Sequence, residues 1–259
     1  MSDRMFVVRS WAQRKIGMSQ PQDFGEGIVS EQYGLILDAL AQRPRARLLE
    51  VGCGTGVNLD RISRRFPEAA LTGLEIHEGD ASQARELLGA RGRVVVGDAV
   101  SMPFADAEFD FVILPHVIEH VRNPNAILRE IRRVLAPEGL LQVNTPNWMR
   151  TWNLLLSQIP FMQPRLRWER RPGETDEEFR GHLREYVDAG LRATITEAGY
   201  TVIRSRGVRP RMFFGGGPSW VIFNSAKVAL SRVFSLLGND TSDDLAMLAR
   251  PSRDAARPG

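Results

Sequence analysis

The sequence contains only one cysteine, Cys53, among its 259 residues. A single thiol cannot form a disulfide within the chain, and it supplies too few ligands for a zinc site built from several cysteines. The composition therefore excludes a small secreted fold held by disulfides and suits a reducing compartment. We expect the protein to be cytoplasmic.

The chain also lacks a marked excess of charge of either sign, since 34 Lys and Arg stand against 31 Asp and Glu. The arginines are scattered along the chain instead of gathering in one stripe. Nucleic-acid binding usually needs a basic patch, so we expect no nucleic-acid partner.

Long apolar runs are equally scarce. Near the N-terminus, Arg9 interrupts a short apolar start and no small-residue cleavage site follows, which argues against a secretory leader. The most apolar stretch, residues 220–237, contains Lys227 and Arg232 and is a poor candidate for a membrane span. Peripheral contact with a membrane surface stays open.

Short apolar runs alternate with amphipathic segments between Arg47 and Asn147. This alternation indicates βαβ units and a parallel sheet. We predict strands over 47–52, 70–75, 93–98, 109–114, 139–144, 201–205 and 244–249. We predict helices over 30–40, 58–66 and 187–198, and from Asn123 to near Gly139, where Asn123 is the cap and Pro124 the first helical residue.

One domain accounts for most of the chain, as is common for α/β proteins of this length. Residues 1–29 are predicted to be an N-terminal extension, 30–250 the domain, and 251–259 a disordered tail. Two insertions interrupt the pattern, at about 148–185 and 208–240. The first is rich in aromatic residues and fits either a lid over a ligand or the contact of a homodimer. The second contains an apolar helix, which fits packing on the domain, a hydrophobic substrate or a bilayer surface.

The segment LLEVGCGTG runs from an apolar strand directly into a helix. Three glycines lie at the turn: Gly52, Gly54 and Gly56. They permit positive φ angles and let a ligand approach the backbone closely. A dinucleotide fingerprint would place its third glycine at position 57, where this chain has Val57. Glu50 precedes the loop, and its carboxylate disfavours a pyrophosphate and favours a ligand with an ammonium group.

The pattern E-x-G-x-G-x-G after a strand resembles the first motif of class I S-adenosylmethionine (SAM)-dependent methyltransferases. Glu75 and Asp98 follow the second and third predicted strands, where this family also has acidic residues. The resemblance implies an α/β fold, a Rossmann-like three-layer sandwich with a mostly parallel sheet and an antiparallel last strand. It also implies SAM as the cofactor, with Glu75 at the ribose hydroxyls and Asp98 at the adenine amino group. The candidate cofactor-binding residues are Tyr33, Glu50, Gly52, Gly54, Gly56, Glu75, Ile76, Asp98, Ala99 and Pro115.

Ligands of open α/β sheets lie at the carboxyl ends of the strands, so the segment PHVIEHV would face the reacting methyl group. His116 is a candidate catalytic residue there. With Glu119 and His120 it also forms H-x-x-E-H, the inverted zinc-protease motif, although a position after a strand does not fit that class. Ubiquinone-biosynthesis O-methyltransferases have E-x-x-E-H here and are associated with a divalent metal, and this sequence is similar except at His116. We predict no metal, and a metal held by His116, Glu119 and His120 is the alternative.

His182 is the second candidate catalytic residue, because it lies between the first insertion and the next predicted helix. Histidine titrates near neutrality and suits removal of a proton from an acceptor, while a structural role in ordering the insertion fits equally well. Together the motifs predict an enzyme that methylates a small molecule, with a hydroxyl as the expected acceptor. N- or C-methylation of a sugar, lipid or natural product, and noncatalytic SAM binding, are the alternatives.

Overall fold

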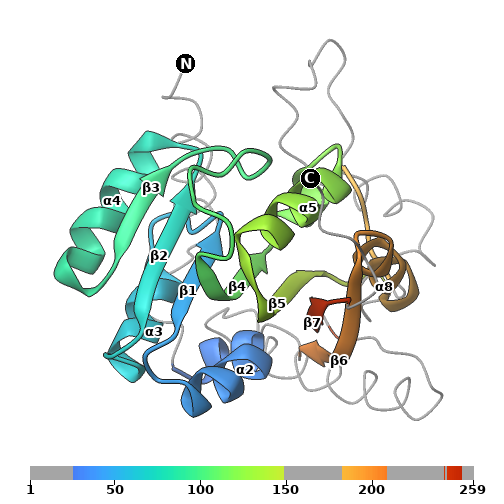
Figure 1. Ribbon diagram of the computed structural model, residues 1–259, viewed down its shortest axis with the longest axis horizontal. Coiled ribbons are helices and arrows are strands. Elements are labelled where there is room, and N and C mark those ends of the chain that lie inside the picture. Colours follow the sequence, from blue (N-terminus) through green and yellow to red (C-terminus); the bar gives the residue numbers. More distant parts are fainter. Residues whose placement is uncertain (1–25, 149–182, 209–241, 243, 253–259) are drawn as a thin grey trace, which may run out of the picture.

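The computed structural model describes residues 26–148, 183–208, 242 and 244–252. Seven strands form one sheet in the order β3-β2-β1-β4-β5-β7-β6 (Figure 1). Their bounds are β1 (Arg47–Val51), β2 (Ala70–Glu75), β3 (Arg93–Val96), β4 (Phe109–Pro115), β5 (Leu135–Pro146), β6 (Tyr200–Val208) and β7 (Asp244–Pro251). Strands β1 to β5 pair in parallel, whereas β7 pairs antiparallel with β5 and with β6. The predicted fold class is confirmed, including the antiparallel last strand.

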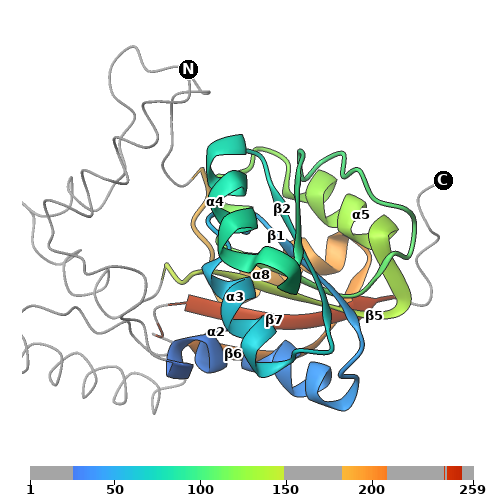
Figure 2. The same ribbon diagram turned by 90° about the vertical axis from the view of Figure 1, so that its left-hand side faces the viewer.

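Helices cover both faces of this sheet. The α-helices of the described residues are α2 (Glu26–Gln42), α3 (Val57–Arg65), α4 (Glu78–Leu88), α5 (Pro124–Val134) and α8 (Asp188–Glu197), and η2 (Gly89–Arg91) and η3 (Ile118–His120) are single 3₁₀ turns. Figure 2 shows α2, α3 and α4 on one face, with α5 and α8 on the other. This arrangement is the three-layer sandwich that the sequence predicts.

The two cores alternate along the central strands. Leu48, Phe111 and Ile113 pack with α2, α3 and α4, while Leu49 and Val112 pack with α5 and α8. Successive side chains of a strand point to opposite faces, so a strand buried on both faces must be apolar at nearly every position. This requirement explains why the strand pattern in the sequence is a continuous apolar run instead of an alternation.

The structure departs from the sequence prediction most clearly in two helices. The helix expected to reach Gly139 ends at Val134, and β5 begins at Leu135. Pro137 explains the early end, because the residue before a proline avoids the helical region and proline offers no amide for a helical hydrogen bond. The second difference is α4, which was not predicted, because its buried residues Ala81, Ala84 and Leu88 make only a narrow apolar stripe.

The carboxyl ends of the parallel strands lie along one edge of the sheet, and the undescribed segments 149–182 and 209–241 both connect there. Asn147, directly after β5, forms a parallel bridge with Tyr186, and the amide of Trp148 donates to the Tyr186 carbonyl at 2.7 Å. At the same edge, Val208 of β6 lies opposite Asp244 of β7. The described ends of the first predicted insertion therefore lie directly after β5, and those of the second lie on the neighbouring strands β6 and β7.

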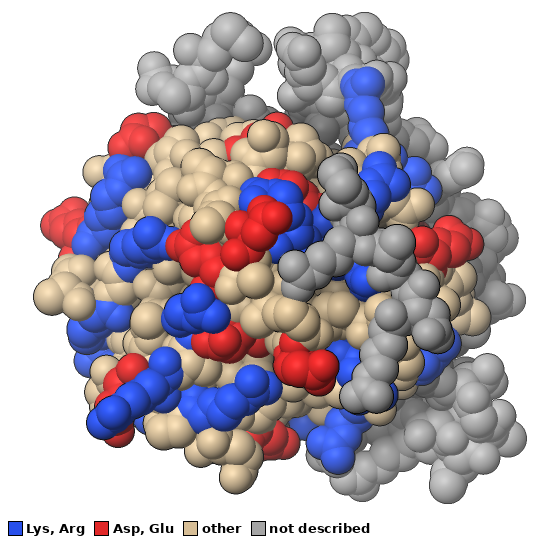
Figure 3. Space-filling model, in the orientation of Figure 1, with Lys and Arg blue, Asp and Glu red and all other residues tan. Residues whose placement is uncertain are grey.

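The surface of the described residues mixes both charges. Figure 3 shows Lys and Arg side chains interspersed with Asp and Glu over the visible face of the molecule. No helix among the described residues is long and apolar enough to cross a membrane. The predicted helix within 219–237 lies outside the described residues.

Candidate functional site

The glycine loop between β1 and α3 crosses the end of β2. The amides of Gly52 and Cys53 donate to the Leu74 carbonyl at 2.8 and 3.0 Å. Gly52 and Gly56 have φ angles of 75° and 79°, a region that side chains with a Cβ rarely adopt. A Cβ on Gly52 would lie 2.5 Å from Cγ2 of Val117. Glycine is therefore required at these turns, both for the φ angles and for the close approach of Val117, which follows β4.

Glu75 anchors this loop at the end of β2. Its Oε2 accepts from the amide of Gly54 at 2.8 Å and its Oε1 from the amide of His77 at 3.1 Å. The side chain is buried beside the loop. A carboxylate fixed by two amides has a set orientation and keeps lone pairs for further donors, which suits a pair of ligand hydroxyls.

Glu50 lies beneath the loop and is completely buried. Its Oε1 accepts from Asn58 Nδ2 at 3.0 Å, and the same amide nitrogen donates to the Tyr33 hydroxyl at 2.9 Å. Oε2 is buried without a hydrogen-bond partner. Burial above all, and then the charge of Glu75, raise the pKa of Glu50 to about 8, although the bond from Asn58 opposes this shift. A buried carboxyl with a vacant acceptor offers a place for a donor that carries positive charge.

Tyr33 is itself only 1% exposed, so its ring belongs to the core beneath the loop and its hydroxyl meets Asn58. Cys53 is also buried, and burial together with the charges of Glu50 and Glu75 raises the pKa of its thiol. An un-ionised thiol is a poor nucleophile. Cys53 fills space against Gly73, where an added Cβ would lie 2.5 Å from its sulfur.

The third group of candidates lies beyond β2 and β3. Ile76 follows Glu75 and leaves 58% of its surface exposed, which is unusual for a large apolar residue at a strand end. Asp98 is exposed, and its Oδ1 accepts from the amide of Val100 at 3.0 Å. Ala99 is partly buried against the core. An apolar side chain and a carboxylate at neighbouring strand ends suit the flat face and the polar edge of a purine.

His116 occupies a strained position at the end of β4. Its φ angle is 52°, and among the described residues only Ala107 shares this feature without being a glycine. Such backbone costs of order 1 kcal/mol and marks functional sites. Nδ1 lies 3.5 Å from Glu119 Oε1 and Nε2 lies 3.7 Å from Asp244 Oδ2. The imidazole is thus flanked by two carboxylates, one of them from the distant strand β7.

Glu119 is the buried member of this group. Thr145 Oγ1 donates to its Oε2 at 3.1 Å, and Nε2 of His120 lies 3.8 Å from its Oε1. Burial acts to raise the pKa of Glu119, but the interaction with the neighbouring His116 outweighs it, so the pKa is lowered. Within the described ranges no group of three His, Cys, Asp or Glu side chains is arranged to hold a metal ion.

Of the two remaining candidates, only Pro115 lies within the described residues. Pro115 is buried at the end of β4, opposite Asn144 of β5. His182 lies outside the described residues, although the amide of its neighbour Leu183 donates to the Glu119 carbonyl at 2.8 Å. The structure brings the glycine loop, Glu50 and Glu75 together, and places His116 and Glu119 around the next strand end.

Comparison with known proteins shows the family of this chain. A family model described as a methyltransferase domain matches residues 49–143. The demethylmenaquinone methyltransferase of Beutenbergia cavernae is 31% identical over 189 residues, which cover 70% of this chain and 74% of that protein. The chain belongs to the SAM-dependent methyltransferases. Class I members of this family use SAM as their cofactor, and the sheet order of this chain fits that class.

Two other relatives are similar to this methyltransferase over shorter stretches. The malonyl-[acyl-carrier protein] O-methyltransferase of Geobacter sulfurreducens is 39% identical over 37% of this chain and 36% of its own. The ubiquinone/menaquinone biosynthesis C-methyltransferase UbiE of Dinoroseobacter shibae is 39% identical over 42% of this chain and 45% of its own. The chain thus spans less than half the length of either relative.

Solved structures support the fold independently. A SAM-dependent methyltransferase of Methanosarcina mazei superposes with a TM-score of 0.56 at 18% identity, covering 85% of this chain and 98% of that one. The likeness at this identity concerns the fold alone.

Three residues of this methyltransferase site were not predicted from the sequence. Asn58 could have been found as a polar residue in the first helical turn after the glycines, facing back toward Glu50. Val117 gave no signal beyond being apolar. Asp244 is the first residue of the last strand, and nothing local in the sequence relates it to His116.

Proposed function

We propose that this methyltransferase transfers the methyl group of SAM to a hydroxyl of a small molecule. The observation that carries the proposal is His116, a strained histidine between two carboxylates at the strand end beside the cofactor loop. A hydroxyl needs to lose its proton on methylation, whereas many other acceptors carry a free lone pair at neutral pH. A positioned histidine is the commonest group for that task.

The chain's own residues fit the cofactor. Glu75 would accept from the two ribose hydroxyls, since its carboxylate is oriented by the amides of Gly54 and His77. Glu50 offers its vacant oxygen to the positively charged end of the cofactor. Ile76, Asp98 and Ala99 would contact the adenine. SAM supplies an already activated methyl group on its sulfonium, so the protein mainly aligns the acceptor.

Proton removal is the second task of the chain. Glu119 would orient His116 through Nδ1, which leaves Nε2 as the atom that receives the acceptor proton, with Asp244 stabilising the charge that forms. His182 would share in this proton transfer or order the segment that contains it. Both undescribed segments connect at this edge, so they are the place to look for selectivity toward the acceptor.

C-methylation is the second candidate, because the UbiE relative is a C-methyltransferase and carbon acceptors such as phenols also lose a proton. The test is turnover with a panel of phenols, sugars and carboxylic acids, followed by NMR of the product. A methyl group on oxygen supports the proposal, and a methyl group on carbon overturns it in favour of the second candidate. SAM binding without any S-adenosylhomocysteine produced, even with metabolite extracts, would support noncatalytic binding.

The metal alternative has its own test. If His116, Glu119 and His120 held a divalent ion, EDTA would abolish turnover and Mg²⁺ would restore it. We expect full activity in chelator, with His116 acting directly as the base.

A further inference from the structure

The loop between β3 and β4, residues 97–108, carries two of the residues proposed to contact adenine. It contains no helix or strand, and its only regular feature is an isolated bridge between Asp98 and Ser101. The amides of Val100 and Ser101 donate to the side chain and the carbonyl of Asp98 at 3.0 and 3.1 Å. These local bonds shape the turn, and the amide of Gly97, which donates to the Glu75 carbonyl at 3.1 Å, holds only the start of the loop to the sheet.

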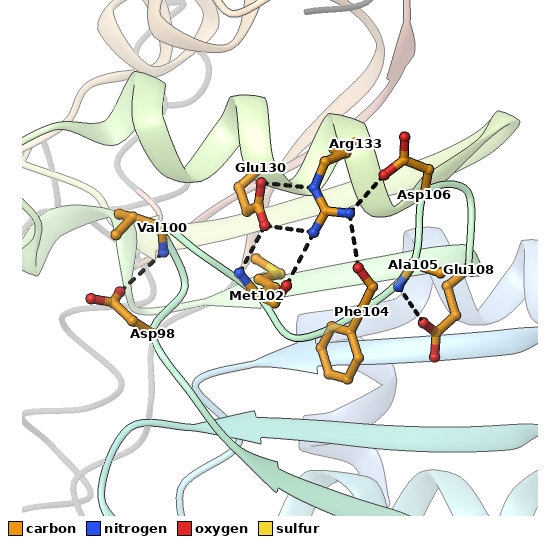
Figure 4. Close-up of polar contacts among 9 residues, drawn as sticks. All are labelled: Asp98, Val100, Met102, Phe104, Ala105, Asp106, Glu108, Glu130 and Arg133. Carbon is orange, nitrogen blue, oxygen red and sulfur yellow. Dashed lines mark hydrogen bonds and ion pairs between the residues drawn. The ribbon is translucent and has the colours of Figure 1, made fainter. Parts of the chain in front are cut away.

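Two side chains of α5 hold this loop from outside (Figure 4). Arg133 donates from Nη1 to the Phe104 carbonyl at 2.8 Å and from Nη2 to the Met102 carbonyl at 3.1 Å. Glu130 Oε1 accepts from the Met102 amide at 2.7 Å. Arg133 Nη1 also reaches Asp106 Oδ1 at 2.7 Å. Side chains of one helix therefore bond both an amide and two carbonyls of the loop backbone.

The two side chains also hold each other. Arg133 donates from Nε and Nη2 to the two Glu130 oxygens at 3.0 and 2.7 Å, a bidentate pair. The bond from Arg133 lowers the pKa of Glu130, while Glu130 and then Asp106 raise the pKa of Arg133, so both groups stay ionised. The side chains are 30% and 15% exposed. Charge-assisted bonds of this geometry, partly shielded from water, are stronger than ordinary surface ion pairs.

Apolar packing alone would not define the backbone of this loop. Met102 and Phe104 are buried, and the rings of Phe104 and Phe109 meet edge to face at 5.0 Å. Their backbone groups go into the protein with them and need partners there. Arg133 and Glu130 supply those partners and thereby select one position for the chain that begins at Asp98.

We propose that Arg133 and Glu130 are positioning residues for the adenine end of the cofactor site. They touch no cofactor, and they act by fixing the loop that presents Asp98 and Ala99. This inference rests on the proposed roles of those two residues. It predicts that loss of the guanidinium fork changes how well the protein distinguishes an adenine from a purine without the amino group.

The test compares Arg133→Lys with Arg47→Lys. Arg47 is a matched control, because its side chain also bonds a carboxylate twice and a carbonyl once, those of Asp110 and Ala107. These contacts hold the far end of the same loop, where it enters β4, and leave the end with Asp98 and Ala99 untouched. Lysine keeps the charge and loses the planar fork in both variants. Calorimetry measures the dissociation constants of S-adenosylhomocysteine and S-inosylhomocysteine, which has oxygen in place of the amino group, and thermal melts measure stability.

We expect Arg133→Lys to weaken S-adenosylhomocysteine binding about tenfold and to reduce the preference over the inosyl compound by a similar factor. Glu130→Gln should act in the same direction, and Arg47→Lys should leave the preference unchanged even if it lowers the melting temperature as much. An unchanged preference in Arg133→Lys, or an equal change in Arg47→Lys, overturns the inference. Failure of the proposed cofactor site would look different, since the unaltered protein would then bind neither compound.

Discussion

The part of the site proposed to hold the cofactor (the cofactor half) and the part proposed to hold the acceptor (the acceptor half) are assembled in different ways. The cofactor half, residues 47–101, contains β1 to β3 and the short turns that follow them, and its candidate residues come from consecutive strand ends. The acceptor half is formed by β4, β5, β6 and β7. There His116 meets Asp244 from the last strand, and two long segments interrupt the strands between them.

This difference shows which part of the protein is free to change. In the cofactor half, Gly52, Gly54 and Glu75 constrain one another through backbone contacts, so few substitutions fit. The acceptor half connects to the undescribed segments at exposed positions such as Trp148 and Leu183. A family that keeps one cofactor and varies its acceptors needs this division between a fixed half and a variable half.

The largest expected effect concerns the buried charge of the cofactor half. Because burial raises the pKa of Glu50 to about 8, the folded chain binds this proton more tightly than the unfolded chain, where the pKa is 4.5. This contribution to the free energy of unfolding is complete below pH 4.5, the pKa in the unfolded chain, and is lost as the pH rises from there to about 8. The full loss is about 5 kcal/mol. Urea unfolding across this range should show the free energy of unfolding falling with pH, and Glu50→Gln should flatten the curve.

Glu68→Gln is the matched control, because Glu68 is exposed and its ion pair with Arg45 lies on the surface. Its pH profile should equal that of the unaltered protein. Parallel curves for Glu50→Gln and the unaltered protein would mean that Glu50 is ionised in the fold, and that the cofactor half tolerates a buried charge.

The next prediction concerns the contact between the two halves, where Gly52 of the cofactor half meets Val117 of the acceptor half. Gly52→Ala adds a Cβ 2.5 Å from Val117 at a φ angle of 75°, so we expect a loss of about 2–4 kcal/mol in the free energy of unfolding. Adding Val117→Ala should recover the part due to the collision and leave the part due to the backbone. Gly79→Ala in α4, where nothing lies within 4 Å of the added atom, should be neutral or stabilising. Equal losses in the single and double variants would show that Val117 does not confine the loop.

The sequence predicted the strands and turns of the cofactor half well because their determinants are local. A strand, a glycine turn and a helix follow one another, and carboxylates at the next two strand ends must reach the same edge of a parallel sheet. The contacts between candidates were less visible. Glu50, expected near an ammonium group, proved to be wholly buried with Asn58 and Tyr33.

The acceptor half was less predictable, because its contacts depend on tertiary structure. The pairing of His116 with Asp244 follows from β7 lying between β5 and β6, an order that no short motif encodes. The bonds from Arg133 to the loop 97–108 were also not predictable from a local motif. An arginine in the last turn of a helix usually indicates only a favourable interaction with the helix dipole. Pro137 could have predicted the strand start at Leu135, because it disfavours a helical Ala136. The helical spacing of the apolar residues up to Leu135 pointed the other way.

The third prediction asks whether the acceptor half supplies a base. His116→Gln should lower kcat about a hundredfold or more and leave SAM affinity nearly intact, with a loss that shrinks at high pH, where the acceptor ionises unaided. His182→Ala is expected to behave alike if it relays the same proton, and the double variant should then lose little more than either single one. A loss of binding for both substrates with an unchanged pH profile would assign a structural role to the histidine concerned.

The smallest effect should separate two neighbouring carboxylates of the cofactor half. Glu75→Ala removes the acceptor that Gly54 and His77 orient, and we expect SAM affinity to fall by about 1.5 to 3 kcal/mol, the scale of hydrogen bonds to a charged group. Glu78→Ala, three residues along the chain, removes an exposed carboxylate paired with Arg85, and SAM affinity should hold. Calorimetry with SAM decides between them, and NAD should bind to neither variant nor to the unaltered protein. Because Glu75 also anchors the loop, a thermal melt is needed beside each titration. A Glu75→Ala protein that melts normally and keeps its SAM affinity would mean that the ribose binds elsewhere. Glu75 would then only support the glycine turn.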